Sequence, residues 1–199
     1  MKRLLVCLSL WSIAGGVTAK PANYRFDPVH SQLVFFIKHL EFSHAIGRFS
    51  AWTGQFRFDP EDWSSATVDV TIPVATLDLG DDGWNRKILG AQWLNAQKFA
   101  DMRFISERVQ PIDADDARVI GQLTLLGITR PVTLDVHLND IGVHSLTFKP
   151  TVGFTATARL QRSAFGLTTS SGSVGDEIEI RIEVEGQRID PAMRKPRKR

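Results

Sequence analysis

The chain has 199 residues, with 24 Lys and Arg, 22 Asp and Glu, and a single cysteine, Cys7. One cysteine excludes a disulfide-stapled fold, so a hydrophobic core must supply the stability. Residues 188–199 contain six basic residues and one acidic residue, a charge of +5, whereas residues 20–187 contain 16 basic and 21 acidic residues, a charge of −5. An acidic body with a basic tail excludes a nucleic-acid-binding domain, which would carry its positive charge on a folded face.

The first 19 residues have the features of a secretory signal peptide. Two basic residues precede an apolar run over residues 4–13, and small residues end at Ala19. The apolar run is too short to span a bilayer. We therefore predict a signal peptide over residues 1–19, cleavage after Ala19, and an exported protein that has lost Cys7.

An alternating run begins the rest of the chain, just after a short apolar piece and an Asp-Pro turn signal. Ser31, Leu33, Phe35, Ile37 and His39 share one parity, and strand side chains change face at every residue, so these five point the same way. An ordinary core strand has no need of a histidine on the face that carries two large apolar residues. A strand in the wall of a cavity does, if the cavity holds a ligand with a polar head.

Alternation continues through most of the chain. Apolar residues of one parity recur over residues 47–59, 68–74, 119–125, 132–138, 154–160 and 178–184. One apolar and one polar face on each strand indicate antiparallel sheet with water on one side. Pro73 lacks a ladder donor and should lie at an edge, a bulge or a strand end. No linker or repeat divides residues 20–187, so we predict one domain.

Residues 81–100 break the alternation. Asp82 can cap a helix, Trp84 and Ile88 are one helical turn apart, and Gly90 can end the helix. Residues 93–99 have the pattern of a second short helical piece. A short helix with large apolar residues needs something to cover, so we expect this insert to lie over one end of the sheet structure.

About eight such strands predict a closed antiparallel barrel that removes exposed sheet edges. The inward parity sets mix large residues, such as Phe35, Phe56 and Phe154, with the small residues Ala156 and Ala158. Small inward residues are compatible with a ligand cavity and equally with tight packing against a neighbouring aromatic ring. The periodicity leaves both interiors open.

Two arginines have inward parity. Arg162 extends the inward set of residues 154–160 by one step, and Arg48 matches Phe56 and Phe58 if no bulge intervenes at Gly54. A buried arginine needs a carboxylate, such as Asp176, or a ligand group that carries an anion or a carbonyl. The alternative for each arginine is a structural ion pair at the barrel rim.

Known motifs for metal binding and catalysis are missing from the sequence. The five histidines form no HExxH pattern and have no cysteine ligands beside them, so we predict no metal site. There is no GxSxG elbow, phosphate loop or GxGxxG, so we predict no cofactor and no catalytic residue. Because Ser-His-Asp triads are recognised by geometry, a hydrolase or isomerase that acts in the same cavity stays as the alternative.

The composition of residues 188–199 predicts a disordered basic tail. Such a tail either contacts anionic lipid headgroups or is simply solvated. A stress-related interaction protein that docks through this tail is a third interpretation. Exposed aromatic residues such as Phe36 or Trp63 are where a homodimer would form.

Several separated blocks of this sequence resemble the YceI-like family. Residues 24–31, 35–40 and 47–49 resemble the family's opening, and residues 121–132, 162–167 and 174–178 resemble its later blocks. The blocks occur in the family's order from Tyr24 to Gly186. Residues 84–90 lack the Asp-x-His-Leu run of many members, and residues 100–102 lack the usual proline, which puts the ligand's length or identity in doubt.

The resemblance implies a lipocalin-like antiparallel barrel, exported to the periplasm, that binds a long polyisoprenoid such as a quinone tail or a prenyl chain. It implies roles for His39, Arg48 and Arg162 in contacting the head group or holding the rim. The full set of expected ligand-binding residues is Leu33, Phe35, Ile37, His39, Arg48, Trp52, Phe56, Phe154, Ala156, Ala158, Arg162 and Phe165.

Overall fold

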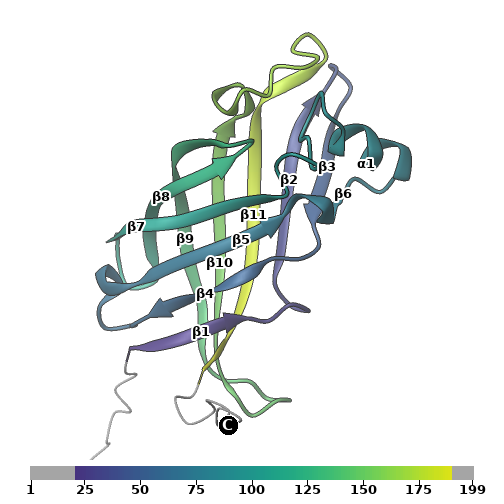
Figure 1. Ribbon diagram of the computed structural model, residues 1–199. Coiled ribbons are helices and arrows are strands. Elements are labelled where there is room, and N and C mark those ends of the chain that lie inside the picture. Colours follow the sequence, from purple (N-terminus) through teal and green to yellow (C-terminus); the bar gives the residue numbers. More distant parts are fainter. Residues whose placement is uncertain (1–20, 190–199) are drawn as a thin grey trace, which may run out of the picture.

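The computed structural model describes residues 21–189, so the predicted signal peptide and most of the basic tail lie outside the described residues. Figure 1 shows strands wrapped into a barrel, with one helix beside its upper end. The strands are β1 (Ala22–Phe26), β2 (Gln32–His39), β3 (Ser43–Phe49), β4 (Thr53–Phe58), β5 (Thr67–Pro73), β6 (Leu77–Asp78), β7 (Asp101–Pro111), β8 (Asp116–Leu125), β9 (Ile128–Val143), β10 (Pro150–Gln161) and β11 (Val174–Arg188). The helices are α1 (Asp82–Leu89) and the 3-10 turns η1 (Trp63–Ser65), η2 (Val74–Thr76) and η3 (Arg162–Phe165).

These eleven strands close into an antiparallel barrel with eight strand positions, as the alternation predicts. The numbers differ because β1 leads into β2, β3 into β4 and β5 into β6 after short breaks. β4 and β5 pair beside β1 in the lower half, whereas β3 and β6 pair beside β2 in the upper half. β11 closes the ring because it pairs with β2 along most of its length and with β1 at its end.

The break between β1 and β2 is organised by the buried carboxylate of Asp27. Its Oδ1 accepts the amides of Val29, at 2.9 Å, and His30, at 3.2 Å, and its Oδ2 accepts the Gln187 side-chain amide at 2.6 Å. Burial raises the pKa of Asp27, but the bonds from the Val29 and His30 amides and the neighbouring imidazole outweigh it and lower the pKa below its usual value. The Asp-Pro turn therefore joins the two halves of one barrel wall.

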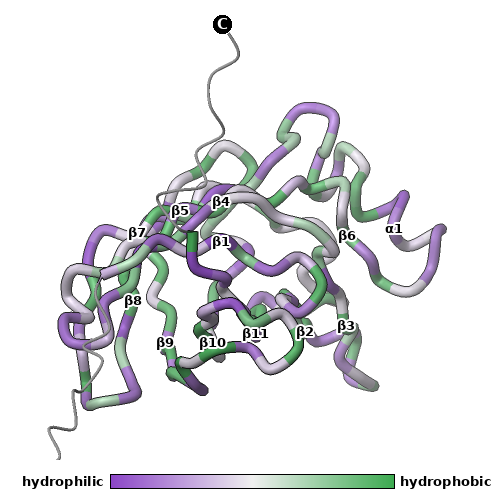
Figure 2. Tube along the Cα trace, turned by 90° about the horizontal axis from the view of Figure 1, so that it is seen from below, coloured by the Kyte–Doolittle hydropathy of each residue, from purple (hydrophilic) through white to green (hydrophobic). Residues whose placement is uncertain are grey.

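The strands form where the sequence alternates. Along β10, Val152, Phe154, Ala156, Ala158 and Leu160 are all buried, while the residues between them are exposed or half-buried. Figure 2, which looks from below, shows hydrophilic and hydrophobic residues mixed along the strands around the ring. Pro73 ends β5, one of the three positions expected for it.

The helical insert differs from its prediction in two details. Asp81, not Asp82, caps α1, because its carboxylate accepts the Trp84 amide at 2.8 Å. Residues 93–99 form turns instead of a second helix. Most of their amides bond to carbonyls of Ile88, Leu89, Gly90 and Asn95, so these turns satisfy their backbone without forming a continuous helix.

The core divides into an upper and a lower cluster. The lower one includes Phe56, Phe58, Trp63 and Phe154, whose rings pack edge to face with centroids 5.0 to 6.0 Å apart. Trp63 is only 6% exposed, so the expectation that it lies on the surface is wrong. The Asp59-Pro60 turn and η1 fold its side chain back over the barrel's lower end.

Candidate functional site

The upper half of the barrel contains a cavity of about 210 Å³. Its wall includes the inward face of β2, at Leu33, Phe35, Ile37 and His39, and the end of β10. α1 closes it from the side through Trp84, Lys87 and Ile88. We call this space the upper chamber.

A second cavity of about 190 Å³ occupies the lower half of the barrel. Phe26, Trp52, Phe56, Phe154 and Ala156 are among its lining residues. Its lining contains no carboxylate, and its one aliphatic hydroxyl is that of Thr67. We call this space the lower chamber. The barrel interior is therefore hollow, which the periodicity alone left open.

The two chambers meet at a common wall that we call the waist. Five apolar residues line both chambers: Leu33, Ile72, Leu123, Leu160 and Ile180. They come from five different strands, so the waist encircles the barrel interior. A flexible hydrocarbon chain that reaches the waist from one chamber meets apolar side chains on both sides of it.

The polar groups of the upper chamber mark its mouth. His39 is half-buried, and Trp84 and Lys87 are exposed, although all three line the chamber. The His39 imidazole lies edge-on to the Trp84 indole, with ring centroids 5.4 Å apart. The end of β2 and α1 thus frame an opening with one imidazole and one ammonium group. This supports the inward orientation expected for His39.

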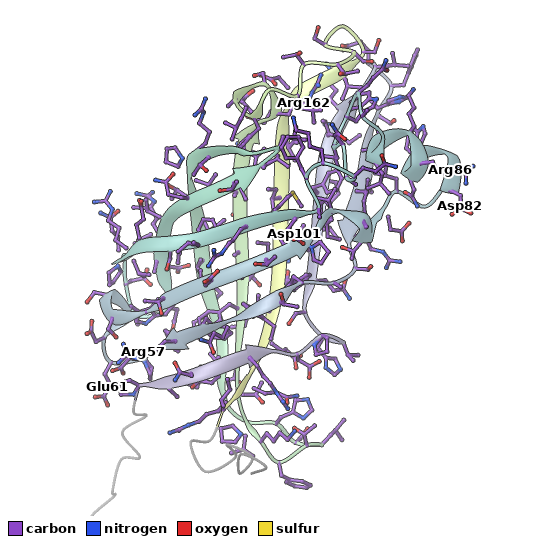
Figure 3. All side chains as sticks on the ribbon, in the orientation of Figure 1. Arg57, Glu61, Asp82, Arg86, Asp101 and Arg162 are labelled. Carbon is purple, nitrogen blue, oxygen red and sulfur yellow. The ribbon has the colours of Figure 1, made fainter. Side chains whose placement is uncertain are left out.

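Arg162 lies in the upper wall, as its parity predicts, but its partners differ from the expected carboxylate. The side chain is 1% exposed, and Figure 3 shows it at the upper end of the barrel. Its guanidinium donates to the carbonyls of Gly175 at 2.8 Å, Leu167 at 2.6 Å, Thr169 at 2.9 Å and Val174 at 2.9 Å. It also lies 6.0 Å from the centroid of the Trp93 ring.

Asp176, the carboxylate expected for Arg162, bonds to Ser163 instead. It accepts the Ser163 hydroxyl at 2.7 Å and the Ser163 amide at 2.8 Å. These two bonds, with a smaller contribution from the charge of Arg162, hold the pKa of Asp176 below 3.8. Arg162 is thus a buried cation whose hydrogen bonds go to backbone carbonyls.

Arg48 points away from the interior, so its expected inward orientation is wrong. Its side chain is 62% exposed and pairs with Asp78 on β6, with Nη2 and Oδ2 2.7 Å apart. The Gly80 amide and this guanidinium together lower the pKa of Asp78. Ala45, Gly47 and Phe49 are the inward residues of β3. Counting the alternation back from Phe56 to Arg48 gave the wrong face, because residues 50–52 separate β3 from β4 and Gly54 has a φ of 138°.

The remaining expected residues fall into two groups. Leu33, Trp52, Phe56, Phe154 and Ala156 line the lower chamber, and Leu33, Phe35 and Ile37 line the upper one. Ala158 and Phe165 are buried in the upper core but line neither chamber. Trp84 and Lys87 were not among the expected site residues, although the spacing of Trp84 and Ile88 predicts an apolar helix face.

Within residues 21–189, no group of three or more His, Cys, Asp or Glu residues is arranged to hold a metal ion. None of the helices in this part of the chain has both the length and the apolar character needed to cross a bilayer.

A closed antiparallel barrel around an apolar cavity is the architecture of lipocalin-like binding proteins. A family model, described as the YceI-like domain, matches residues 24–186. The chain belongs to the YceI-like family. A UPF0312 protein of Pectobacterium atrosepticum is 33% identical over 189 residues, covering 94% of this chain and 97% of that protein. A UPF0312 protein of Shewanella baltica is 30% identical and covers 94% of this chain and 98% of that protein.

Solved structures share the fold. BcnA of Burkholderia cenocepacia is 27% identical, with a TM-score of 0.73, covering 80% of this chain and 98% of that structure. The YceI protein of Campylobacter jejuni is 27% identical, with a TM-score of 0.70, covering 77% of this chain and 90% of that structure. A polyisoprenoid-binding domain of Saccharophagus degradans is 12% identical, with a TM-score of 0.59, covering 83% of this chain and 98% of that structure, a likeness of fold.

Proposed function

We propose that this protein binds a polyisoprenoid or a similar long-chain amphipathic lipid, such as an isoprenoid quinone, and carries or sequesters it in the periplasm. One observation carries the proposal: two apolar chambers of about 210 and 190 Å³ meet at a shared waist inside a closed barrel. Since each methylene group removed from water contributes about 0.8 kcal/mol, such an interior can hold a long tail with few polar contacts.

The mouth of the upper chamber suits the polar head of such a lipid. His39 and Lys87 carry donors there, and the exposed Trp84 provides an aromatic face. A quinone carbonyl or a prenyl phosphate could accept a hydrogen bond from either donor while the tail extends toward the waist. The half-buried position of His39 keeps the head group close to solvent.

The family relationship supports the ligand class. The Saccharophagus degradans structure with the same fold is described as a polyisoprenoid-binding domain. The proposed signal peptide over residues 1–19 provides the export that a periplasmic carrier needs. Contact of the basic tail with membrane and formation of a homodimer stay as predictions of the sequence.

Binding accounts for the lining better than catalysis does. The described lining residues include no carboxylate, cysteine or serine, and the one imidazole, His39, contacts an indole ring. General acid-base or nucleophilic chemistry needs a nucleophile and a base within hydrogen-bond reach of each other. The alternative of a lipid hydrolase or isomerase would require turnover of a prenyl or acyl substrate that is lost in His39→Ala.

Ligand capacity is tested by filling the lower chamber. Ala156→Phe places a ring inside the chamber, and Thr157→Phe places the same ring outside, because Thr157 is exposed on the opposite face of β10. Native mass spectrometry and organic extraction of the purified protein should detect an isoprenoid lipid. We expect Ala156→Phe to reduce the amount bound severalfold and Thr157→Phe to leave it unchanged.

Two results would contradict the proposal. One is a protein that purifies empty and takes up no quinone or prenyl alcohol from solution. The other is equal lipid content in the two variants when circular dichroism shows that both are folded.

A further inference from the structure

The hairpin between β9 and β10 exposes large apolar side chains. Val143 is 66% exposed, Leu146 is 82% exposed and Phe148 is 80% exposed. Figure 1 shows this hairpin at the bottom of the molecule, far from α1. Residues 143–149 are here called the lower tip. Large apolar side chains that are exposed next to one another often mark an interaction site.

The lower tip is a hydrogen-bonded turn, so the exposure of its apolar side chains follows from an ordered backbone. The His144 amide donates to the Lys149 carbonyl at 2.9 Å, and the Phe148 amide donates to the His144 carbonyl at 2.8 Å. The His144 Nδ1 accepts the amides of Leu146 at 3.1 Å and Thr147 at 3.2 Å. These bonds hold a tight turn that leaves the Leu146 and Phe148 side chains without packing partners in the core.

Basic residues gather at the same end of the barrel. Lys149 is the last residue of the tip, and its Nζ donates to Gln187 Oε1 at 3.4 Å. Gln187 and Arg188 pair with Arg25 and Tyr24 at the end of β11. Asp140, Glu183 and Glu185 also lie here, beside the tip's base, and Asp27 accepts a bond from the Gln187 side chain. These four carboxylates outnumber the three basic groups, Arg25, Lys149 and Arg188, so the folded surface at this end has no excess of positive charge.

The sequence beyond β11 is strongly basic. Residues 190–199 contain five basic residues and one acidic residue, and they start next to Ile189, whose amide donates to the Asn23 carbonyl at 2.8 Å. Thr151, two residues beyond Lys149, pairs with Gln187. Ile189, after which the basic segment follows in the sequence, thus lies at the same end of the barrel as the lower tip, whereas residues 20–187 have a net charge of −5.

We propose that the lower tip docks this protein on an anionic phospholipid membrane, with Leu146 and Phe148 inserted among the acyl chains and the basic residues after Ile189 against the headgroups. A few inserted side chains or a basic segment alone bind membranes weakly, and the two together give stable attachment. The barrel body, being acidic, is held away from the surface, which orients the molecule with the upper chamber's mouth facing away.

A protein partner fits the lower tip less well. An aromatic side chain buries about 150–250 Å² at most, so three apolar side chains fall short of the roughly 800 Å² per partner of a stable interface. A projecting turn also inserts between lipid molecules more readily than it matches a flat protein surface. The basic segment adds charge complementarity to phosphatidylglycerol headgroups.

Vesicle flotation tests the proposal with the purified protein and vesicles of phosphatidylethanolamine and phosphatidylglycerol. Leu146→Ser with Phe148→Asn removes the apolar groups, and asparagine suits the φ of 54° at position 148. The matched control is Phe42→Asn, which removes an 89% exposed aromatic from the β2–β3 turn at the opposite end. We expect about tenfold or greater loss of binding for the double variant and none for the control.

Two further measurements test the electrostatic part. Deletion of residues 190–199 should weaken binding about tenfold or more and remove most of its salt dependence. Vesicles of phosphatidylcholine alone should bind the intact protein at least about tenfold less well. The Leu146→Ser, Phe148→Asn double variant and the deletion variant should both retain the lipid that co-purifies with the protein. This result separates a failure of docking from a failure of ligand binding.

The proposal is overturned if the double variant binds vesicles as the intact protein does, or if Phe42→Asn causes the loss instead. It is equally overturned if the double variant changes the protein's mass in analytical ultracentrifugation and leaves vesicle binding intact, because the lower tip would then be a contact between copies of the chain.

Discussion

The Arg162 side chain links several backbone segments at the upper end of the barrel. Its guanidinium reaches four carbonyls, two in the segment between η3 and β11, at Leu167 and Thr169, and two at the start of β11, at Val174 and Gly175. A planar guanidinium has five N–H donors in a fixed fork, so it can serve several carbonyls at once. This arrangement orders a loop that contains mainly Gly, Ser and Thr, and it places a cationic side chain in the wall of the upper chamber.

We predict that Arg162→Lys lowers the free energy of unfolding by about 2–4 kcal/mol, because lysine has a single ammonium that cannot satisfy four separated carbonyls. Arg159→Lys is the matched control, since Arg159 lies three residues before Arg162, near the end of β10, with its side chain 69% exposed. It should cost less than about 0.5 kcal/mol. Urea unfolding followed by circular dichroism measures both. Equal midpoints for the two variants would contradict the structural role of Arg162.

Asp176 gives a pH-dependent prediction. The Ser163 hydroxyl and amide lower its pKa in the folded state below the usual 3.8. A lowered pKa stabilises the folded state above the usual value and loses that contribution as the pH falls through the lowered value. We expect Asp176→Asn to reduce the melting temperature at pH 7 and to differ less from the unchanged protein below about pH 4. A difference that grows as the pH falls would be inconsistent with this assignment.

Single residues also show where sequence reasoning stops. The parity of His39 was counted along one continuous strand, and the structure places it in the chamber wall as predicted. The orientation of Arg48 was counted across the break between β3 and β4, and one irregular residue there reverses the predicted face of every residue beyond it. The carbonyl partners of Arg162 had no sequence signal, because every residue has a carbonyl and only the folded loop brings four of them together.

At the scale of elements, glycines in the strands make room for aromatic rings from other strands. Gly47 on β3 pairs with Phe35 on β2, and a Cβ at position 47 would collide with the Phe35 ring. A Cβ at Gly186 on β11 would collide with the ring of Phe56, which reaches across β1 from β4. Phe35 lines the upper chamber and Phe56 lines the lower one. These glycines therefore set how far two of the largest lining residues protrude into the cavities.

We predict that Gly47→Ala displaces the Phe35 ring toward the upper chamber, lowers stability by about 1–3 kcal/mol and reduces lipid uptake. Gly142→Ala, on β9, is the control, because a Cβ there meets no atom within 4 Å. Thermal unfolding and a fluorescent fatty-acid displacement assay measure the two effects. If both variants behave alike, the contact between Gly47 and Phe35 does not shape the chamber.

The elements were predictable to different degrees. Alternation indicated every long strand except β7, and the spacing of Trp84 and Ile88 indicated α1, because both patterns report which face is buried. The breaks that divide three barrel positions into six short strands were harder. They depend on tertiary contacts such as the bond from Gln187 to Asp27, which joins residues far apart in the sequence. The turns at residues 93–99 were predicted as helix because their local apolar spacing is helical.

For the whole molecule, the sequence indicates which side chains face inward but not how much space they leave. Cavity volume depends on the fit between side chains from all eight strand positions, and the alternation is the same for a filled barrel and a hollow one. The family resemblance favoured a hollow interior, and the structure contains two chambers that meet at the waist. Their arrangement raises the question of whether one ligand or two occupy the barrel.

We predict that one lipid tail crosses the waist and occupies both chambers. In the unchanged protein, affinity should rise with prenyl chain length, by about 0.8 kcal/mol for each buried methylene, until both chambers are filled. Leu160→Trp adds bulk at the waist and should stop this rise at a shorter chain. Leu160→Ala widens the waist and should preserve binding of the longest chains. Titration with prenyl alcohols of increasing length measures the three curves.

Leu138→Trp provides the control for added bulk, because Leu138 is half-buried in the lower core but lines neither chamber. Its length dependence should match that of the unchanged protein. Native mass spectrometry then distinguishes the two occupancies directly. Two short lipids bound per chain in both the unchanged protein and Leu160→Trp, with no preference for length, would mean that the waist separates two independent sites, since a tail that crosses it leaves room for only one ligand.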